Sequence, residues 1–216
     1  EHTLALILGV YRKLFAVDQA VRTNQWDPSA FSLSTHTIHG HTVGVVGMGQ
    51  IGQRVARLLR AFGAEVLYAD PLPLSTDAEH ALGVTRVPLP ELLRAADIVT
   101  LHVSLSAESH HLIGRQELAL LKPTALLVNT CRGAVVDEAA LIETLTARRI
   151  LGAALDVLEA EPPAPDNPLF QLDNVLLSPH MAGNSYDTWF RRGQFMFQNM
   201  QRVWAGQPPL AVVNGV

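Results

Sequence analysis

Three side chains of catalytic type each follow a segment that is predicted to be a buried strand. Arg132 comes shortly after the apolar residues 124–129, and Glu161 and His180 follow two later apolar runs. An arginine can hold a carboxylate through two parallel hydrogen bonds and polarise a neighbouring carbonyl. A histidine can deliver or remove the proton on that oxygen, and a carboxylate paired with it would keep it protonated.

Each of these residues also has a purely structural interpretation. Arg132 can be a solvated turn residue, Glu161 and the nearby Glu159 can be loop residues that only aid solubility, and His180 can be an ordinary loop histidine. The carboxyl ends of parallel strands meet at one edge of a sheet, where ligands bind. Because nothing in a core requires an arginine, an acid and a histidine at that edge, their coincidence favours chemistry.

A glycine-rich turn near the start of the chain supplies the other half of a possible site. Residues 42–46 are apolar and β-branched, and GMGQIG follows at 47–52. Apolar residues then recur at helical spacing, and a second apolar run at 65–69 ends at Asp70, 18 residues beyond Gly52. The order strand, Gly-x-Gly-x-x-Gly, helix, strand and acid is typical of a dinucleotide site.

Each residue of this turn has a mechanical role in such a site. Gly47 permits the tight turn, Gly49 lets the backbone approach a pyrophosphate, and Gly52 lets the helix pack against the strand. The free N–H groups of the helix that begins near Gln50 would face the phosphates. Asp70 can accept a hydrogen bond from a ribose 2′-OH, and its charge would repel a 2′-phosphate. NAD is therefore favoured over NADP.

The alternation of strands and helices predicts an α/β fold of the Rossmann type, with a doubly wound parallel sheet. Strands are expected at 42–46, 65–69, 85–87, 97–101, 124–129, 150–155 and 174–177. Helices are expected at 2–21, from about 50, within 88–96, at 137–148 and at 185–205, whereas 71–81 is expected to be a loop.

Composition excludes several classes of function. The formal net charge of −4 over 216 residues gives no electrostatic footprint for nucleic acid. The apolar runs are too short to span a bilayer, and no basic segment precedes the first of them, so we expect neither a membrane span nor a signal peptide. One cysteine excludes an internal disulfide and fits a reducing, cytoplasmic location.

For the other reactive side chains, the sequence favours structural roles. His36, His39 and His41 are close in sequence but have no carboxylate or cysteine at ligand spacing, so a solvated loop is expected and no metal site. Cys131 is interpreted as a small residue in a tight turn, because no base stands beside it. Asp156 can cap a turn, although its position at a strand end also suits a bond to a nicotinamide amide.

Five segments together resemble the nucleotide-binding domain of the D-isomer-specific 2-hydroxyacid dehydrogenases, a family that includes phosphoglycerate dehydrogenase and glyoxylate/hydroxypyruvate reductase. They are, in order, VGVVGMGQIG, DIVTLHVSLSAES, LLVNTCRGAVVDEAAL, AALDVLEAEPP and LLSPHMAG. The resemblance implies that the catalytic residues are Arg132, Glu161 and His180. It also implies cofactor contacts at Gln50, Ile51, Asp70, Val103, Thr130, Cys131, Asp156 and Gly183.

The chain departs from the family pattern in places. Ser104, Ser109 and Cys131 stand where the family usually has proline, threonine and alanine, and these changes touch the loops around the cofactor. The family's substrate domain, of roughly 100 residues, is expected to be absent from this chain. Residues 1–205 are then the NAD-binding domain, with a leading helix at 1–21 and a connecting loop at 22–41. Residues 206–216 are a tail that would return to a substrate domain.

The function implied is reversible hydride transfer between NAD(H) and C2 of a D-2-hydroxy acid or 2-keto acid. Arg132 would orient the substrate, His180 would act as acid and base, and Glu161 would tune His180. The resemblance also implies a homodimer formed through the nucleotide-binding domain. Two alternatives remain: an NAD(H)-binding sensor like the related transcriptional corepressors, and a truncated domain that binds cofactor without turnover.

Overall fold

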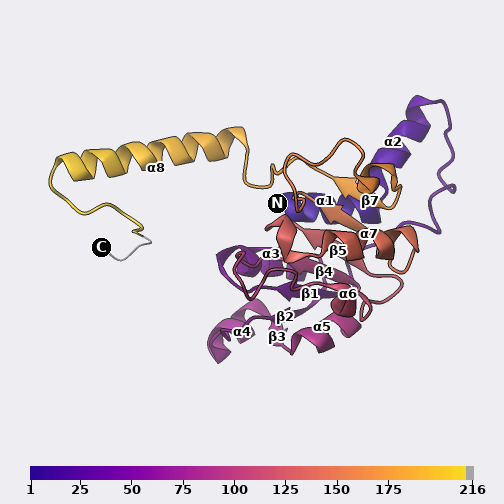
Figure 1. The fold of residues 1–216 in the computed structure, drawn as a ribbon, viewed down its shortest axis with the longest axis horizontal. Helices are drawn as coiled ribbons and strands as arrows, with labels where there is room; N and C mark the ends of the chain where they lie inside the picture. The colour runs from indigo at the N-terminus through magenta and orange to yellow at the C-terminus, as the bar shows by residue number, and fades with distance from the viewer. Residues whose placement is uncertain (213–216) are drawn as a thin grey trace. The chain divides into compact units, whose positions relative to one another are not determined.

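In the computed structural model, which describes residues 1–212, a seven-stranded parallel sheet forms the centre of residues 1–179 (Figure 1). The strand order is β3-β2-β1-β4-β5-β6-β7. The strands are β1 Thr42–Val46, β2 Glu65–Ala69, β3 Val84–Arg86, β4 Ile98–Leu101, β5 Leu126–Asn129, β6 Gly152–Leu155 and β7 Val175–Leu177. The predicted doubly wound Rossmann-type sheet is confirmed.

Helices connect these strands along the chain. They are α1 His2–Tyr11, α2 Leu14–Arg22, α3 Gln50–Ala61, α4 Thr76–Leu82, α5 Leu89–Ala95, α6 Arg115–Leu118, α7 Glu138–Thr146 and α8 Tyr186–Trp204, with short 3-10 helices η1 Gly133–Val135 and η2 Pro168–Gln171. After β3 the chain crosses back to place β4 beside β1. The order therefore reverses between β1 and β4, which is where sheets of this type bind ligands.

Each face of the sheet has its own hydrophobic core. Val43 and Val45 of β1 lie in one cluster with side chains of α1 and α3, whereas Val46 lies in the other with side chains of α5 and α7. Gly44 faces α5 so closely that a Cβ there would lie 2.3 Å from a methyl carbon of Leu92. Successive strand residues point to opposite faces, which explains why every β1 residue after the first is buried.

The single helix predicted at 2–21 is wrong. The chain forms α1 and α2 instead, and Lys13 between them adopts a left-handed conformation with φ 49°. The apolar periodicity continues across the break because both halves are helical. Only α1 packs on the sheet, whereas no residue of α2 is buried.

The loop predicted at 71–81 is also wrong, because α4 forms there. The side chain of Ser75 accepts a hydrogen bond from Ala78 N, and Gly83, with φ 65°, ends the helix. A serine N-cap and a glycine C-cap are both sequence signals for helix ends. The following strand begins at Val84, one residue before the prediction.

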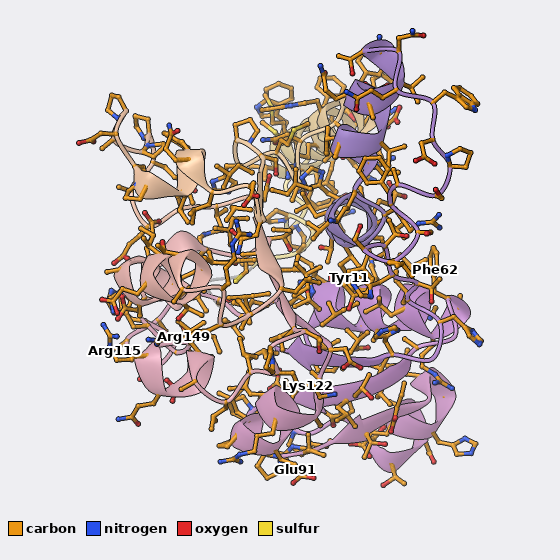
Figure 2. The ribbon with its side chains drawn as sticks, turned by 90° about the vertical axis from the view of Figure 1, so that its right-hand side faces the viewer. Tyr11, Phe62, Glu91, Arg115, Lys122 and Arg149 are labelled. Atoms are coloured by element: carbon orange, nitrogen blue, oxygen red, sulfur yellow. The ribbon has the colours of Figure 1, made fainter. Side chains whose placement is uncertain are left out.

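Asp97 joins three separate elements at the amino-terminal edge of the sheet. Its carboxylate accepts hydrogen bonds from Lys122 Nζ at 2.8 Å and from Thr42 N at 3.0 Å. Its carbonyl oxygen accepts one from the hydroxyl of Tyr11 in α1 at 3.3 Å (Tyr11 and Lys122 are labelled in Figure 2). Tyr11 is 1% exposed, and burial raises the pKa of its hydroxyl.

The chain divides into two compact units, and the second begins at His180. Its helix α8 is capped by Ser185, whose hydroxyl accepts a hydrogen bond from Thr188 N. Part of the predicted tail at 206–216 folds against α8, since Leu210 N donates to Asn199 Oδ1; residues 213–216 lie outside the described range. Within residues 1–212, no helix combines the length and apolarity needed to cross a membrane.

We expect Asp97→Asn to lower the free energy of unfolding by about 1 kcal/mol at pH 7, since a partly exposed charged hydrogen bond is lost. Burial raises the pKa of Asp97, but the bonds from Lys122 and Thr42 outweigh it and hold the pKa below its usual range. The stabilisation is therefore complete above about pH 3.9, the usual value for aspartate, and disappears as the pH falls through the lowered pKa.

Urea unfolding of both proteins between pH 7 and pH 3 measures this difference. It should shrink toward zero at the acid end, whereas Asp166→Asn, in an exposed loop, should match the parent protein throughout. A difference that stays constant with pH would show that Asp97 acts through packing and not through its charge.

Candidate functional site

A cavity of about 1000 Å³ lies at the carboxyl ends of β1 to β4. Gly47 and Gly49 line it after β1, Asp70 after β2, Arg86 in β3 and Val103 after β4. Its volume is at the upper end of the roughly 300–1,000 Å³ typical of ligand pockets. Four of the predicted cofactor contacts therefore share one cavity at the point where the strand order reverses.

The three glycines of the turn differ in what surrounds them. Gly47 has φ +91°, and a Cβ there would lie 2.6 Å from the carbonyl oxygen of His102. A Cβ at Gly52 would lie 2.1 Å from the carbonyl oxygen of Gly47, whereas one at Gly49 would meet nothing within 4 Å. Protein atoms thus fill the space at the first and third glycines, and the middle one faces the open cavity.

The amino-terminus of α3 provides an electrostatic contribution to anion binding at this site. Gly49 is the N-cap, with no side-chain cap hydrogen bond, and Gln50 and Ile51 of the first turn are exposed. The N–H groups of a helix N-terminus favour an anion. This geometry fits the pyrophosphate of a dinucleotide.

Asp70 is held in place by backbone N–H groups. Its Oδ2 accepts from Met48 N at 2.7 Å, inside the glycine turn, and its Oδ1 accepts from Leu72 N at 2.8 Å. Each carboxylate oxygen can accept a further hydrogen bond, so a ribose hydroxyl can still bind. Asp70, which directly follows β2, therefore links the end of this strand to the glycine turn through a hydrogen bond.

Arg86 and His102 line the same cavity and were missed in the sequence. Arg86 Nη2 donates to the carbonyl oxygen of Asp70 at 2.9 Å. The ring of His102 lies 2.9 Å from Thr100 Oγ1, and burial lowers its pKa to about 4, so it is neutral at pH 7. The dinucleotide pattern has no position for either residue, although His102 directly follows the apolar run 97–101, at a strand end where ligands bind.

The loop after β5 is organised by the buried Asn129. Its Oδ1 accepts from the backbone N–H and the thiol of Cys131, at 3.0 and 3.1 Å, and its Nδ2 donates to the carbonyl oxygen of Arg132. Burial raises the pKa of Cys131, which keeps the thiol protonated. These contacts support the tight-turn interpretation of Cys131. Thr130, one residue earlier, meets Thr3 of α1 through their hydroxyls at 3.0 Å.

Arg132 and Glu161 lie on loops that touch. A Cβ at Gly133 would lie 1.9 Å from the carbonyl oxygen of Leu158, so the loops after β5 and β6 pack backbone against backbone. Leu158 N donates to Glu161 Oε1 at 3.1 Å. Both Arg132 and Glu161 are exposed. The structure therefore brings two of the three predicted catalytic residues to one edge of the sheet.

Asp156 is a buried member of the predicted cofactor contacts. It is 1% exposed, and its Oδ1 accepts a hydrogen bond from Ser178 Oγ at 2.5 Å. His2 Nε2 lies 3.0 Å from the same hydroxyl and 3.3 Å from Asp156 Oδ1. His2 and Ser178 were missed in the sequence because 176 residues separate them.

His180 and Gly183 belong to the second unit. His180 opens it, is exposed, and has φ +50°; its carbonyl oxygen accepts from Asn184 Nδ2 at 3.2 Å. Gly183 is exposed within the same unit. The meeting of His180 with Arg132 and Glu161 stays a prediction.

Comparison with known proteins identifies a family whose members bind NAD. The family model for "D-isomer specific 2-hydroxyacid dehydrogenase, NAD binding domain" matches residues 4–182. A glyoxylate reductase of Korarchaeum cryptofilum is 41% identical over 99% of this chain, and the chain spans 65% of that relative's length.

Solved structures of similar proteins also match. The holo form of D-mandelate dehydrogenase from Rhodotorula graminis has a TM-score of 0.88 and 35% identity, covering 99% of this chain and 64% of the other. An acyclic imino acid reductase in complex with NADPH and D-Arg has a TM-score of 0.86 and 32% identity, covering 98% and 66%.

We expect Gly49→Ala to weaken NADH binding by about tenfold or more, which corresponds to about 1.4 kcal/mol. The added methyl group would occupy the open space where a pyrophosphate approaches. Since it meets no protein atom, the unfolding temperature should change by only about 2 °C. NADH fluorescence titration and thermal unfolding measure the two effects.

Gly193→Ala in α8 is the matched control, because a Cβ there also meets nothing within 4 Å. It should leave NADH affinity unchanged. Parental affinity in Gly49→Ala would contradict the assignment of the glycine turn to the pyrophosphate.

Proposed function

The chain belongs to the D-isomer-specific 2-hydroxyacid dehydrogenase family as its NAD-binding domain, and from this we propose that the protein is an NAD-dependent dehydrogenase. The reaction is hydride transfer between NAD(H) and C2 of a D-2-hydroxy acid or 2-keto acid. One observation carries the proposal: the loops of Arg132 and Glu161 touch at the same sheet edge that holds the glycine-turn cavity.

Arg132 is proposed to bind the substrate carboxylate and polarise the adjacent carbonyl. Its Nη1 donates to the carbonyl oxygen of Cys131 at 2.6 Å, which fixes one side of the guanidinium. A guanidinium carries five N–H donors in a planar fork, so donors remain for a carboxylate. Its exposure gives a substrate access to that fork.

His180 is proposed to supply the proton to the carbonyl oxygen during reduction and to remove it during oxidation. Glu161 would pair with His180 and keep the imidazole protonated before reduction; the hydrogen bond from Leu158 N orients its carboxylate. When bound, NAD(H) donates or accepts the hydride. The chain's own residues then orient the substrate and move one proton.

Asp70 is proposed to set the preference for NAD over NADP. Two backbone N–H groups hold its carboxylate at the end of β2, inside the cavity. A fixed negative charge there accepts a hydrogen bond from a ribose hydroxyl and repels a 2′-phosphate.

We also propose a homodimer formed through the nucleotide-binding domain. No residue of α2 is buried, and Phe15 is 69% exposed. Trp26, in the segment after α2, is 80% exposed, and Leu33 is fully exposed. Exposed apolar side chains that gather on one part of a chain mark interaction sites, and a second copy is the commonest partner. A cytoplasmic location is proposed from the single free thiol of Cys131.

His180→Gln should lower turnover by about 10²- to 10⁴-fold, the usual contribution of a general acid, and leave NADH affinity nearly unchanged. NADH oxidation with a panel of 2-keto acids in the complete polypeptide, together with NADH titration, tests this. His80→Gln, on the exposed surface of α4, is the control. Equal losses of turnover and NADH affinity would contradict the assignment. Binding of NADH by the parent protein without turnover of any acid would instead support a non-catalytic module.

Phe15→Glu should convert the dimer to a monomer, because a buried carboxylate would face the partner's apolar surface. Size-exclusion chromatography with light scattering measures the mass. Phe62→Glu, at the end of α3 and 44% exposed, is the control and should remain dimeric (Figure 2). A monomeric parent protein, or a dimeric Phe15→Glu, would refute the proposed interface.

A further inference from the structure

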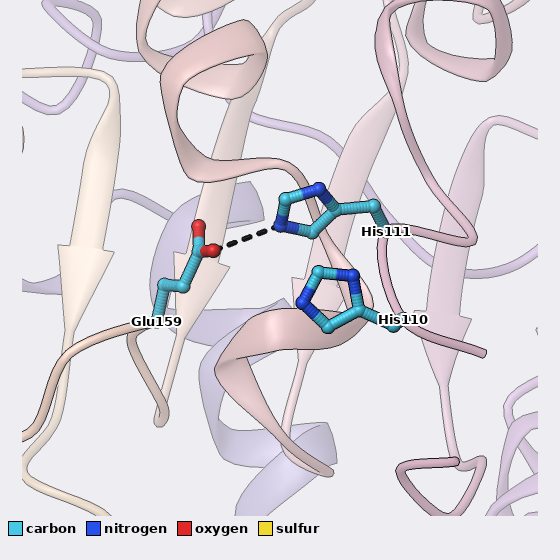
Figure 3. A group of neighbouring side chains, drawn as sticks. All are labelled: His110, His111 and Glu159. Atoms are coloured by element: carbon cyan, nitrogen blue, oxygen red, sulfur yellow. Dashed lines mark hydrogen bonds and ion pairs between the residues drawn. The ribbon is translucent and has the colours of Figure 1, made fainter. Parts of the chain in front are cut away.

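Three side chains with metal-binding chemistry meet outside the nucleotide cavity (Figure 3). They are His110 and His111, in the segment between β4 and α6, and Glu159, after β6. Their potential ligand atoms all lie within 4.8 Å of one another. His111 Nε2 is 2.8 Å from Glu159 Oε1, and the two imidazole rings lie 4.0 Å apart between centroids.

The carboxylate of Glu159 is held by a reciprocal pair of hydrogen bonds. Glu138 N, at the start of α7, donates to Glu159 Oε2 at 3.3 Å, and Glu159 N donates to Glu138 Oε2 at 2.8 Å. Asn167 Nδ2 donates to the other oxygen of Glu138 at 2.8 Å. Such contacts behind a ligand fix its orientation, as second-layer hydrogen bonds do in known metal sites.

His111 is also constrained by its backbone. Its N–H donates to the carbonyl oxygen of Ala134 at 2.8 Å, and Ile113 forms a parallel bridge with Val136 two residues further on. His111 has φ +51°, a backbone conformation that residues other than glycine rarely adopt. Residues held in such conformations cluster at functional sites.

We propose that His110, His111 and Glu159 bind a divalent transition-metal ion of the Zn²⁺ class. Two imidazole nitrogens and one carboxylate are a known ligand set for zinc that keeps one position open for water. On binding, the ion would replace the proton that His111 shares with Glu159. The site is independent of the proposed dehydrogenase reaction, since none of the three residues has a role in it.

The required movement is small. Ligand atoms about 2.0–2.2 Å from a tetrahedral zinc lie about 3.3 Å apart, so the widest separation must shrink by at most about 1.5 Å. His111 and Glu159 are already in contact. His110 is exposed, and rotation of its side chain can bring its nitrogen to the ion.

Calorimetric titration of the tag-free protein with ZnCl₂ tests the proposal. We expect one ion per chain, and an affinity at least about tenfold weaker in His110→Ala, His111→Ala and Glu159→Gln, since losing even a second-layer partner costs 10- to 100-fold. The controls are His80→Ala and Glu91→Gln, which alter exposed residues of α4 and α5 and should bind zinc like the parent (Glu91 is labelled in Figure 2).

His110→Ala tests whether misfolding could explain a loss of zinc binding. His110 is exposed, and its removal takes away only a ring contact with His111, so this variant should fold like the parent. Its unfolding temperature without zinc should equal that of the parent. Visible d–d absorption of added Co²⁺ should appear in the parent and be lost in this variant. No zinc binding by the parent, or equal binding by the three variants and the controls, would overturn the site.

Discussion

Direct packing of backbone against backbone at the end of β1 is the constraint on which the candidate site depends. Position 47 faces the carbonyl of His102, and position 52 faces the carbonyl of Gly47, at distances that exclude any side chain. Helix α3 therefore starts directly against the sheet, and its N-cap residue, Gly49, lines the cavity. Because all seven strands run parallel, the loops after β5 and β6 reach the same edge and can complete a site there.

The features that the sequence predicted well are those encoded locally. Buried strands appear as short apolar runs, so the doubly wound parallel sheet could be predicted from the sequence. The glycine turn and Asp70 lie within a single strand–helix–strand unit, and the structure places them in one cavity. The errors arose where local signals compete. Periodicity alone did not reveal the break at Lys13, and two prolines near Ser75 obscured a helix with good caps at both ends.

Contacts between distant residues could not be predicted, because they depend on the paths of loops. The pairing of Asp156 with His2, and that of His111 with Glu159, join segments with no shared sequence pattern. A parallel sheet predicted only that Arg132 and Glu161 would lie at the same edge; the structure adds that their loops touch. The third member of the predicted trio follows the last strand and opens a separate unit, so strand order alone does not position it.

The position of α1 has a consequence for how the protein folds. This helix precedes all seven strands in the sequence, yet it packs on β5, β6 and β7, the three strands that come last. The face that includes the buried Leu4 and Ile7 packs on strands of which the first begins only at Leu126. Closing so long a loop is entropically costly, so α1 docks on these strands late in folding and its apolar face is exposed until then.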